Sequence, residues 1–91
     1  MTGAYATADR VLAECHDAGR SGIFILADHA LERANERKIG RADLRNALSE
    51  ADQALLQTNG RWLITGGHDL DGEGVTLVVT LYRGLVIVTL F

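Results

Sequence analysis

The sequence predicts an α+β domain in which N-terminal helices pack on a C-terminal antiparallel meander of three to four strands. Apolar residues recur at intervals of three and four until about residue 52, and from Ala54 onward the period changes to two. The chain has 91 residues, of which 47% are hydrophobic and 23% charged, as in an ordinary folded domain. We therefore expect residues 1–91 to form a single domain, with helices first and a sheet after them.

The first helix is expected over residues 7–18, with Thr7 as its N-cap and Gly19 as its C-terminal stop. Cys15 belongs to the apolar face of this helix and should be a small core residue. It is the only cysteine, so an internal disulfide is excluded. The apolar run at residues 23–26 that follows is short, and it predicts either a brief strand or a packed segment at the entry to the second helix.

Two more helices are expected before the sheet. The second covers residues 28–38, begins with Asp28 as N-cap, and buries Ala27, Ala30, Leu31 and Ala34. The third covers residues 41–52 after a break at Gly40 and buries Leu44, Ala47, Leu48 and Ala51. Both patterns indicate helices that lie with one side on a core.

Four strands are expected in the remainder, at residues 54–58, 61–66, 75–82 and 85–91. Asn59-Gly60 predicts a two-residue type I′ turn between the first two, because both residues tolerate the positive φ values that this turn requires. Arg83-Gly84 connects the last two strands. The final strand is rich in Val, Ile and Leu, and we expect it to form an exposed edge of the sheet.

A stripe of positively charged groups on the second helix is the first candidate site. His29, Arg33 and Arg37 are spaced by four residues, so their side chains stack along one side of a helix. Groups that can carry like charges repel one another, and folding alone gives no reason to align them. The stripe suggests phosphate binding or catalysis. The alternative is a solvated surface, in which His29 pairs with a neighbouring carboxylate and Arg33 forms an ordinary ion pair with Glu36.

Charge and motif content limit the other function classes. The net charge of −3 argues mildly against nucleic-acid binding, although Arg33, Arg37, Lys38, Arg41 and Arg45 could form a local basic patch. The loop with His68, Asp69, Asp71 and Glu73 does not have the spacing of a calcium-binding loop, so we expect no metal and no cofactor. We see no signal peptide and no membrane-spanning stretch, and we expect a cytoplasmic protein.

Two segments resemble a small bacterial family of domains of unknown function. FILADHALERANERKIGRADLRNAL is similar to that family's H-A-x-x-R-x-x-x-R-x-I motif and the helix after it. GRWLITGGHDLDGEGVTLVVTLYRGLVIVTLF is similar to the rest of its pattern, a tryptophan, then G-x-D-x-x-G, then two apolar strands. The resemblance covers residues 23–91. The family looks like a relative of the MqsR-type mRNA interferases and, more distantly, of the RelE-type toxins.

The resemblance implies a metal-independent endoribonuclease toxin of a bacterial toxin–antitoxin system, with RNA as substrate and a cognate antitoxin protein as partner. Histidine ordinarily titrates near neutral pH, so His29 would be the base or acid, and Arg33 and Arg37 would hold the phosphate. Contacts to RNA would come from Arg61, His68, Tyr82, Lys38 and Arg41. MqsR-type toxins have a glutamine after the strand tryptophan, where this chain has Leu63, so catalysis would rest on the helix stripe.

The second function class is a binding module without catalysis. Such a domain would share the toxin fold and act through a protein partner or as a homodimer, using the exposed last strand or the acidic loop. Toxicity that is relieved by His29→Ala or Arg37→Ala would favour the ribonuclease, and a stable complex without RNA cleavage would favour the binding module.

Overall fold

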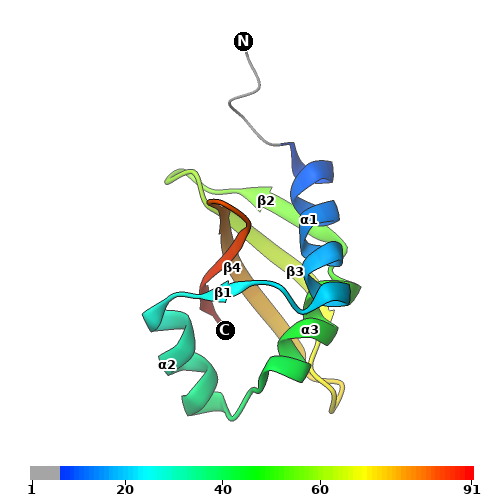
Figure 1. Cartoon of the computed structure of the whole chain (residues 1–91), viewed down its shortest axis with the longest axis vertical. Helices are drawn as coiled ribbons and strands as arrows, with labels where there is room; N and C mark the ends of the chain where they lie inside the picture. The colour runs from blue at the N-terminus through cyan, green and yellow to red at the C-terminus, as the bar shows by residue number, and fades with distance from the viewer. Residues whose placement is uncertain (1–6) are drawn as a thin grey trace.

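Helices α1, α2 and α3 lie against one face of a sheet in the computed structural model, which describes residues 7–91 (Figure 1). The helices are α1 (Ala8–Ser21), α2 (Asp28–Arg37) and α3 (Arg41–Glu50). The strands are β1 (Ile25–Leu26), β2 (Gln53–Leu56), β3 (Trp62–His68), β4 (Gly74–Leu81) and β5 (Leu85–Leu90). The predicted α+β class is confirmed. Residues 1–6, which belong to the segment where we expect no signal peptide, lie outside the described range.

The sheet corrects the prediction of an antiparallel meander of three to four strands. Strands β2 to β5 do form an antiparallel meander, but the sheet is mixed and has five strands in the order β1-β5-β4-β3-β2. The run at residues 23–26 supplies β1, which pairs in parallel with β5 and places Ile25 opposite Val86. Consequently β5 lies between β1 and β4, and the prediction that the last strand forms a sheet edge was wrong.

Helix α1 passes through Gly19, the predicted stop, and ends at Ser21. Thr7 is its N-cap as predicted, and its side chain accepts a hydrogen bond from the Arg10 N–H. The C-cap is Gly22, whose φ of 76° suits the left-handed conformation that glycine adopts readily. Gly19 has a different role, because a Cβ there would lie 2.7 Å from the carbonyl oxygen of Arg45 in α3. The missing side chain lets two helices approach closely.

The ends of α2 and α3 also differ from the prediction. Ala27 is the N-cap of α2, Asp28 is the first helical residue, and no side chain caps the helix. Leu31 is 48% exposed rather than buried, whereas Ala30 and Ala34 do face the core. Helix α3 ends at Glu50 instead of residue 52, because the Asp52 N–H donates 3.0 Å to the carbonyl of Thr65 on β3. The chain therefore joins the sheet earlier than the helical pattern indicates.

The β2–β3 connection is longer than the predicted two-residue turn. The Gln57 N–H donates to the Arg61 carbonyl, and the Gly60 N–H donates to the Gln57 carbonyl. Gly60 has a φ of 82°, but Asn59 has no positive φ, so a type I′ turn is excluded. The geometry fits a three-residue hairpin loop with glycine in the left-handed position. The flanking strands accordingly occupy residues 53–56 and 62–68.

The core lies between the helices and the sheet. Helix α1 packs on α3 and β2, α3 packs on β3, and α2 packs on β5. Gly67 of β3 lies directly beneath α3, since a Cβ there would come within 2.1 Å of the Ala47 carbonyl oxygen. This contact sets the height of α3 above the sheet. No helix among residues 7–91 combines the length and apolar character needed to span a membrane.

Candidate functional site

The predicted stripe lies on the outside of α2. The His29 side chain is 64% exposed, and its Nδ1 lies 4.0 Å from the Oε1 of Glu32. Arg37 is exposed, and within the described residues no carboxylate lies within ion-pair distance of it. These two side chains therefore form a solvated helix surface.

Arg33, the middle residue of the stripe, is partly used by the fold. Its Nε donates 3.2 Å to the carbonyl of Leu90 at the end of β5. Its guanidinium lies 5.7 Å from the centre of the Phe91 ring and 4.0 Å from the Oε1 of Glu36. Since β1 has only two residues, it leaves the end of β5 without a neighbouring strand, and Arg33 supplies a donor there. The arginine connects α2 to the sheet.

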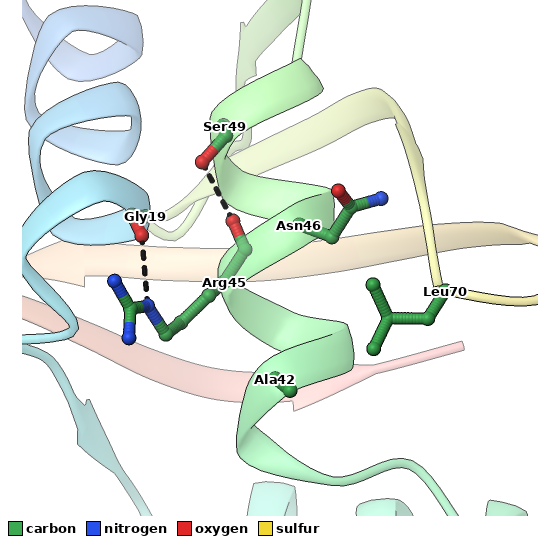
Figure 2. Close-up of a pocket in the computed structure, with 6 residues that line it drawn as sticks. All are labelled: Gly19, Ala42, Arg45, Asn46, Ser49 and Leu70. Carbon is green, nitrogen blue, oxygen red and sulfur yellow. Dashed lines mark hydrogen bonds between the residues drawn. The ribbon is translucent and has the colours of Figure 1, made fainter.

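Two further arginines bind the end of α1 and the segment that follows it. Arg45 donates from Nε to the Gly19 carbonyl at 3.0 Å (Figure 2). Its guanidinium also donates to the Arg20 carbonyl at 2.7 Å. Arg41 donates to the carbonyls of Gly22 and Phe24, and its guanidinium lies 4.0 Å from the centre of the Phe24 ring. The last carbonyls of a helix have no partner within the helix and carry partial negative charge. Arg45 thus acts as a side-chain cap for α1.

We expect Arg45→Ala to lower the free energy of unfolding by about 1–2 kcal/mol, because two backbone carbonyls at a helix C-terminus lose a charged donor. The matched control is Arg37→Ala, which removes an exposed arginine from a helix end and should cost less than about 0.5 kcal/mol. Urea unfolding followed by Trp62 fluorescence gives both values. Equal losses in the two variants would contradict the capping role.

The remaining predicted RNA contacts are dispersed. Lys38 is the exposed C-cap of α2, with a φ of 57°. Arg61 precedes β3 and His68 ends it, which puts them ~20 Å apart at the rise of an extended strand. His68 pairs with Glu50, its Nδ1 lying 3.2 Å from the Oε1. Tyr82 follows β4 and is 68% exposed. The structure therefore distributes these groups over the end of α2 and the ends of β3 and β4.

Asp43 makes two hydrogen bonds to the backbone, and the sequence did not indicate the one to the β3–β4 loop. One of its carboxylate oxygens accepts from the Leu70 N–H at 2.9 Å, and the other accepts from the N–H of Gly40, the N-cap of α3, also at 2.9 Å. These hydrogen bonds, chiefly the one from Leu70, lower the pKa of Asp43 below its ordinary value. One carboxylate therefore holds both the start of α3 and the β3–β4 loop.

The lowered pKa of Asp43 predicts a pH dependence of stability. Its contribution is complete above the unfolded-state pKa of about 4 and decreases as the pH falls through the lower folded-state pKa. We expect Asp43→Asn to be less stable than the wild type at pH 7, and the difference should shrink at pH 2–3. Urea unfolding of both proteins at the two pH values measures it. A difference that is independent of pH would refute the assignment.

Two grooves are lined by described residues, and neither contains a residue of the stripe. The first, of about 290 Å³, lies over α3 between Gly19 and Leu70, with Ala42, Arg45, Asn46 and Ser49 (Figure 2). The second, of about 240 Å³, lies between α1 and the β4–β5 turn and is lined by Glu14, Asp17, Ala18, Ser21, Ile23, Gly84 and Leu85. Within residues 7–91, no three histidine, cysteine or acidic side chains are grouped in a way that could hold a metal ion.

The sheet face opposite the helices is the largest feature that the sequence analysis missed. On β4, Val75, Leu77 and Val79 belong to the core beneath the helices, so Thr76, Val78 and Thr80 alternate onto the other face. The pairing register then shows which residues of the other strands lie on the same face as Thr76, Val78 and Thr80. We call this surface the open face; its residues are Ile25, Gln53, Leu55, Leu63, Thr65, Thr76, Val78, Thr80, Val86 and Thr89.

The open face is uncharged between the strand ends, and half of its ten residues are apolar. Leu55, Leu63 and Val78 are directly opposite one another on successive strands and form a continuous row. Leu55 is 47% exposed and Ile25 is 58% exposed. The other members are threonines, a glutamine and Val86. A contiguous apolar surface of this kind is typical of a binding site on a folded protein.

Cys15 is buried in the core as predicted. Burial, and to a lesser degree the nearby Glu14 carboxylate, raise the pKa of the thiol to about 12. Because the thiolate is the reactive form, Cys15 is not a nucleophile in the folded protein. It is, however, a convenient probe, since thiol reagents should label it only when the domain unfolds.

Comparison of the chain with models of protein families, with curated proteins and with solved structures finds no match. The toxin-like fold and the ribonuclease activity implied by the resemblance therefore stay predictions.

Proposed function

We propose that this domain is a non-catalytic interaction module that binds protein on the open face. The observation that carries the proposal is the pair of Leu55, which is 47% exposed, and half-buried Leu63, which lie opposite each other on a sheet face that the three helices leave uncovered. The helices cover the opposite face and position the sheet. Association through such a surface is driven by removing apolar area from water.

The geometry of the stripe also favours binding over catalysis. A general acid or base must come within hydrogen-bond reach of the reacting group, together with the groups that stabilise the developing charge. Here Arg33 and Arg41 donate to backbone carbonyls, and Arg61, His68 and Tyr82 lie at the ends of β3 and β4. The stripe is thus explained by support of the fold and by solvation.

Photocrosslinking in the cells that produce the protein tests this function. A benzophenone amino acid placed at Leu55 should give a discrete covalent adduct with a protein that mass spectrometry identifies. The same amino acid at Leu31 is the matched control, because Leu31 is 48% exposed and Leu55 47%. We expect an adduct from position 55 and none from position 31. If neither position 55 nor position 63 gives an adduct, the open face is not a protein-binding surface.

The metal-independent ribonuclease toxin is the competing proposal. The observation in its favour is the exposure of His29, Arg37 and Lys38 on one helix. Purified protein should leave a mixed-sequence RNA intact if the interaction module is correct. Cleavage that His29→Ala and Arg37→Ala both abolish, with the variants still folded, would overturn our proposal and support the ribonuclease.

A further inference from the structure

We propose that the occupant of the open face is a second copy of this chain, so that two sheets pack face to face in a symmetric dimer. This inference rests on the proposed function and specifies its partner. It replaces the edge-strand dimer expected from the sequence, since β5 lies inside the sheet.

Charge favours a second copy over a charged partner. The open face has no charged side chain between the strand ends, and it therefore has nothing to attract a nucleic acid or a strongly charged peptide. A two-fold dimer brings the same surface of both chains together, so a charge close to the axis would meet its own copy. An uncharged face avoids this conflict, even though each chain has a net charge of −3.

Side-chain shape also suits a packed pair of sheets. Apart from Gln53, the face consists of β-branched and leucine side chains, on a ladder with register shifts in the β3–β4 and β4–β5 pairings. Inner faces of two sheets pack about 10 Å apart by interdigitating such residues. Val78 lies near the middle, on the third of five strands, between Leu63 and Thr89. Val78 is only 5% exposed within one chain, so a partner would mainly contact the residues around it on the open face.

The size of the face indicates a reversible dimer. Strands of these lengths, about 4.8 Å apart with about 3.3 Å per residue, cover ~400 Å² of flat area on each copy. Side chains project from the sheet, so the accessible area of each face is larger than its flat area. The accessible surface buried on both copies together is then about 1,000 Å², the lower end of the range for specific interfaces. Interfaces of this size associate weakly, and we expect a Kd of roughly 1–100 µM.

Sedimentation velocity over a range of concentrations tests the dimer on the full chain. The wild type, with a chain mass of 9.8 kDa, should shift from monomer to dimer between about 1 and 500 µM. Leu55→Glu should raise the Kd at least about 100-fold, because two like charges enter an apolar interface. Leu31→Glu, the same substitution at 48% exposure on α2, should leave the Kd unchanged. Thr80→Glu on the central strand is a second variant, in which no apolar side chain is lost.

The outcomes separate this inference from the function on which it rests. A wild type that stays monomeric at 500 µM overturns the dimer, and so does an unchanged Kd in both open-face variants. The photocrosslink at Leu55 then decides the function: an adduct with a different protein leaves the interaction module standing, and no adduct removes both. Loss of the dimer in Leu55→Glu and Thr80→Glu, but not in Leu31→Glu, supports the inference.

Discussion

Gly67→Ala is expected to lower the free energy of unfolding by about 3 kcal/mol, the upper end of the usual cost of overpacking. A Cβ at this position would lie 2.1 Å from the carbonyl oxygen of Ala47 and 2.7 Å from its carbonyl carbon. Both are backbone atoms of α3, so relief requires the helix to move away from the sheet. The loss should appear as a lower urea midpoint in Trp62 fluorescence.

Gly74→Ala is the matched control for this prediction. Gly74 begins β4, and a Cβ there would meet no atom within 4 Å. The substitution should change stability by less than about 0.5 kcal/mol. If Gly67→Ala were as harmless as the control, α3 would not lie as close to β3 as the structure has it.

Leu48→Ala is also expected to lower the free energy of unfolding by about 3 kcal/mol. Leu48 is fully buried, with 0% exposure, in the core between α3 and the sheet. Shortening it removes methyl groups from a packed environment and leaves a cavity that rigid neighbours fill incompletely. The rate at which a thiol reagent labels Cys15 gives an independent measure, since labelling requires opening of the same core.

Leu31→Ala supplies the comparison, because this leucine is also helical but is 48% exposed. We expect a change within about 0.5 kcal/mol and little change in the Cys15 labelling rate. Equal losses at Leu48 and Leu31 would contradict the burial of Leu48 between α3 and the sheet.

Much of the fold was predictable because its helices and longer strands have strong periodicity. The change of period near residue 54 separated helices from sheet, and the α3 pattern of Leu44, Ala47 and Leu48 identified its buried side. Strand β1 has only two residues, and a run that short has no period to recognise. Gly19 was interpreted as a helix stop because glycine often ends helices, but its role depends on the approach of α3, a contact between distant residues.

The candidate site was less predictable than the fold. Four-residue spacing correctly placed His29, Arg33 and Arg37 along one side of one helix, but it could not show that Arg33 bonds to Leu90, which is 57 positions away. The roles of Arg41 and Arg45 likewise depend on carbonyls that become accessible only where α1 ends. The sequence did contain a signal for the open face. In the strands, valine, leucine and threonine occupy successive positions, so these residues lie on both faces of the sheet.

Attenuation of methyl NMR signals by a soluble nitroxide tests most directly whether protein covers the open face. Leu55 and Leu31 are equally exposed in one chain, at 47% and 48%, so their methyl groups should be attenuated equally in a free monomer. At concentrations where the dimer forms, we predict that attenuation at Leu55 becomes several-fold weaker than at Leu31. Equal attenuation of the two leucines at every concentration would contradict the account.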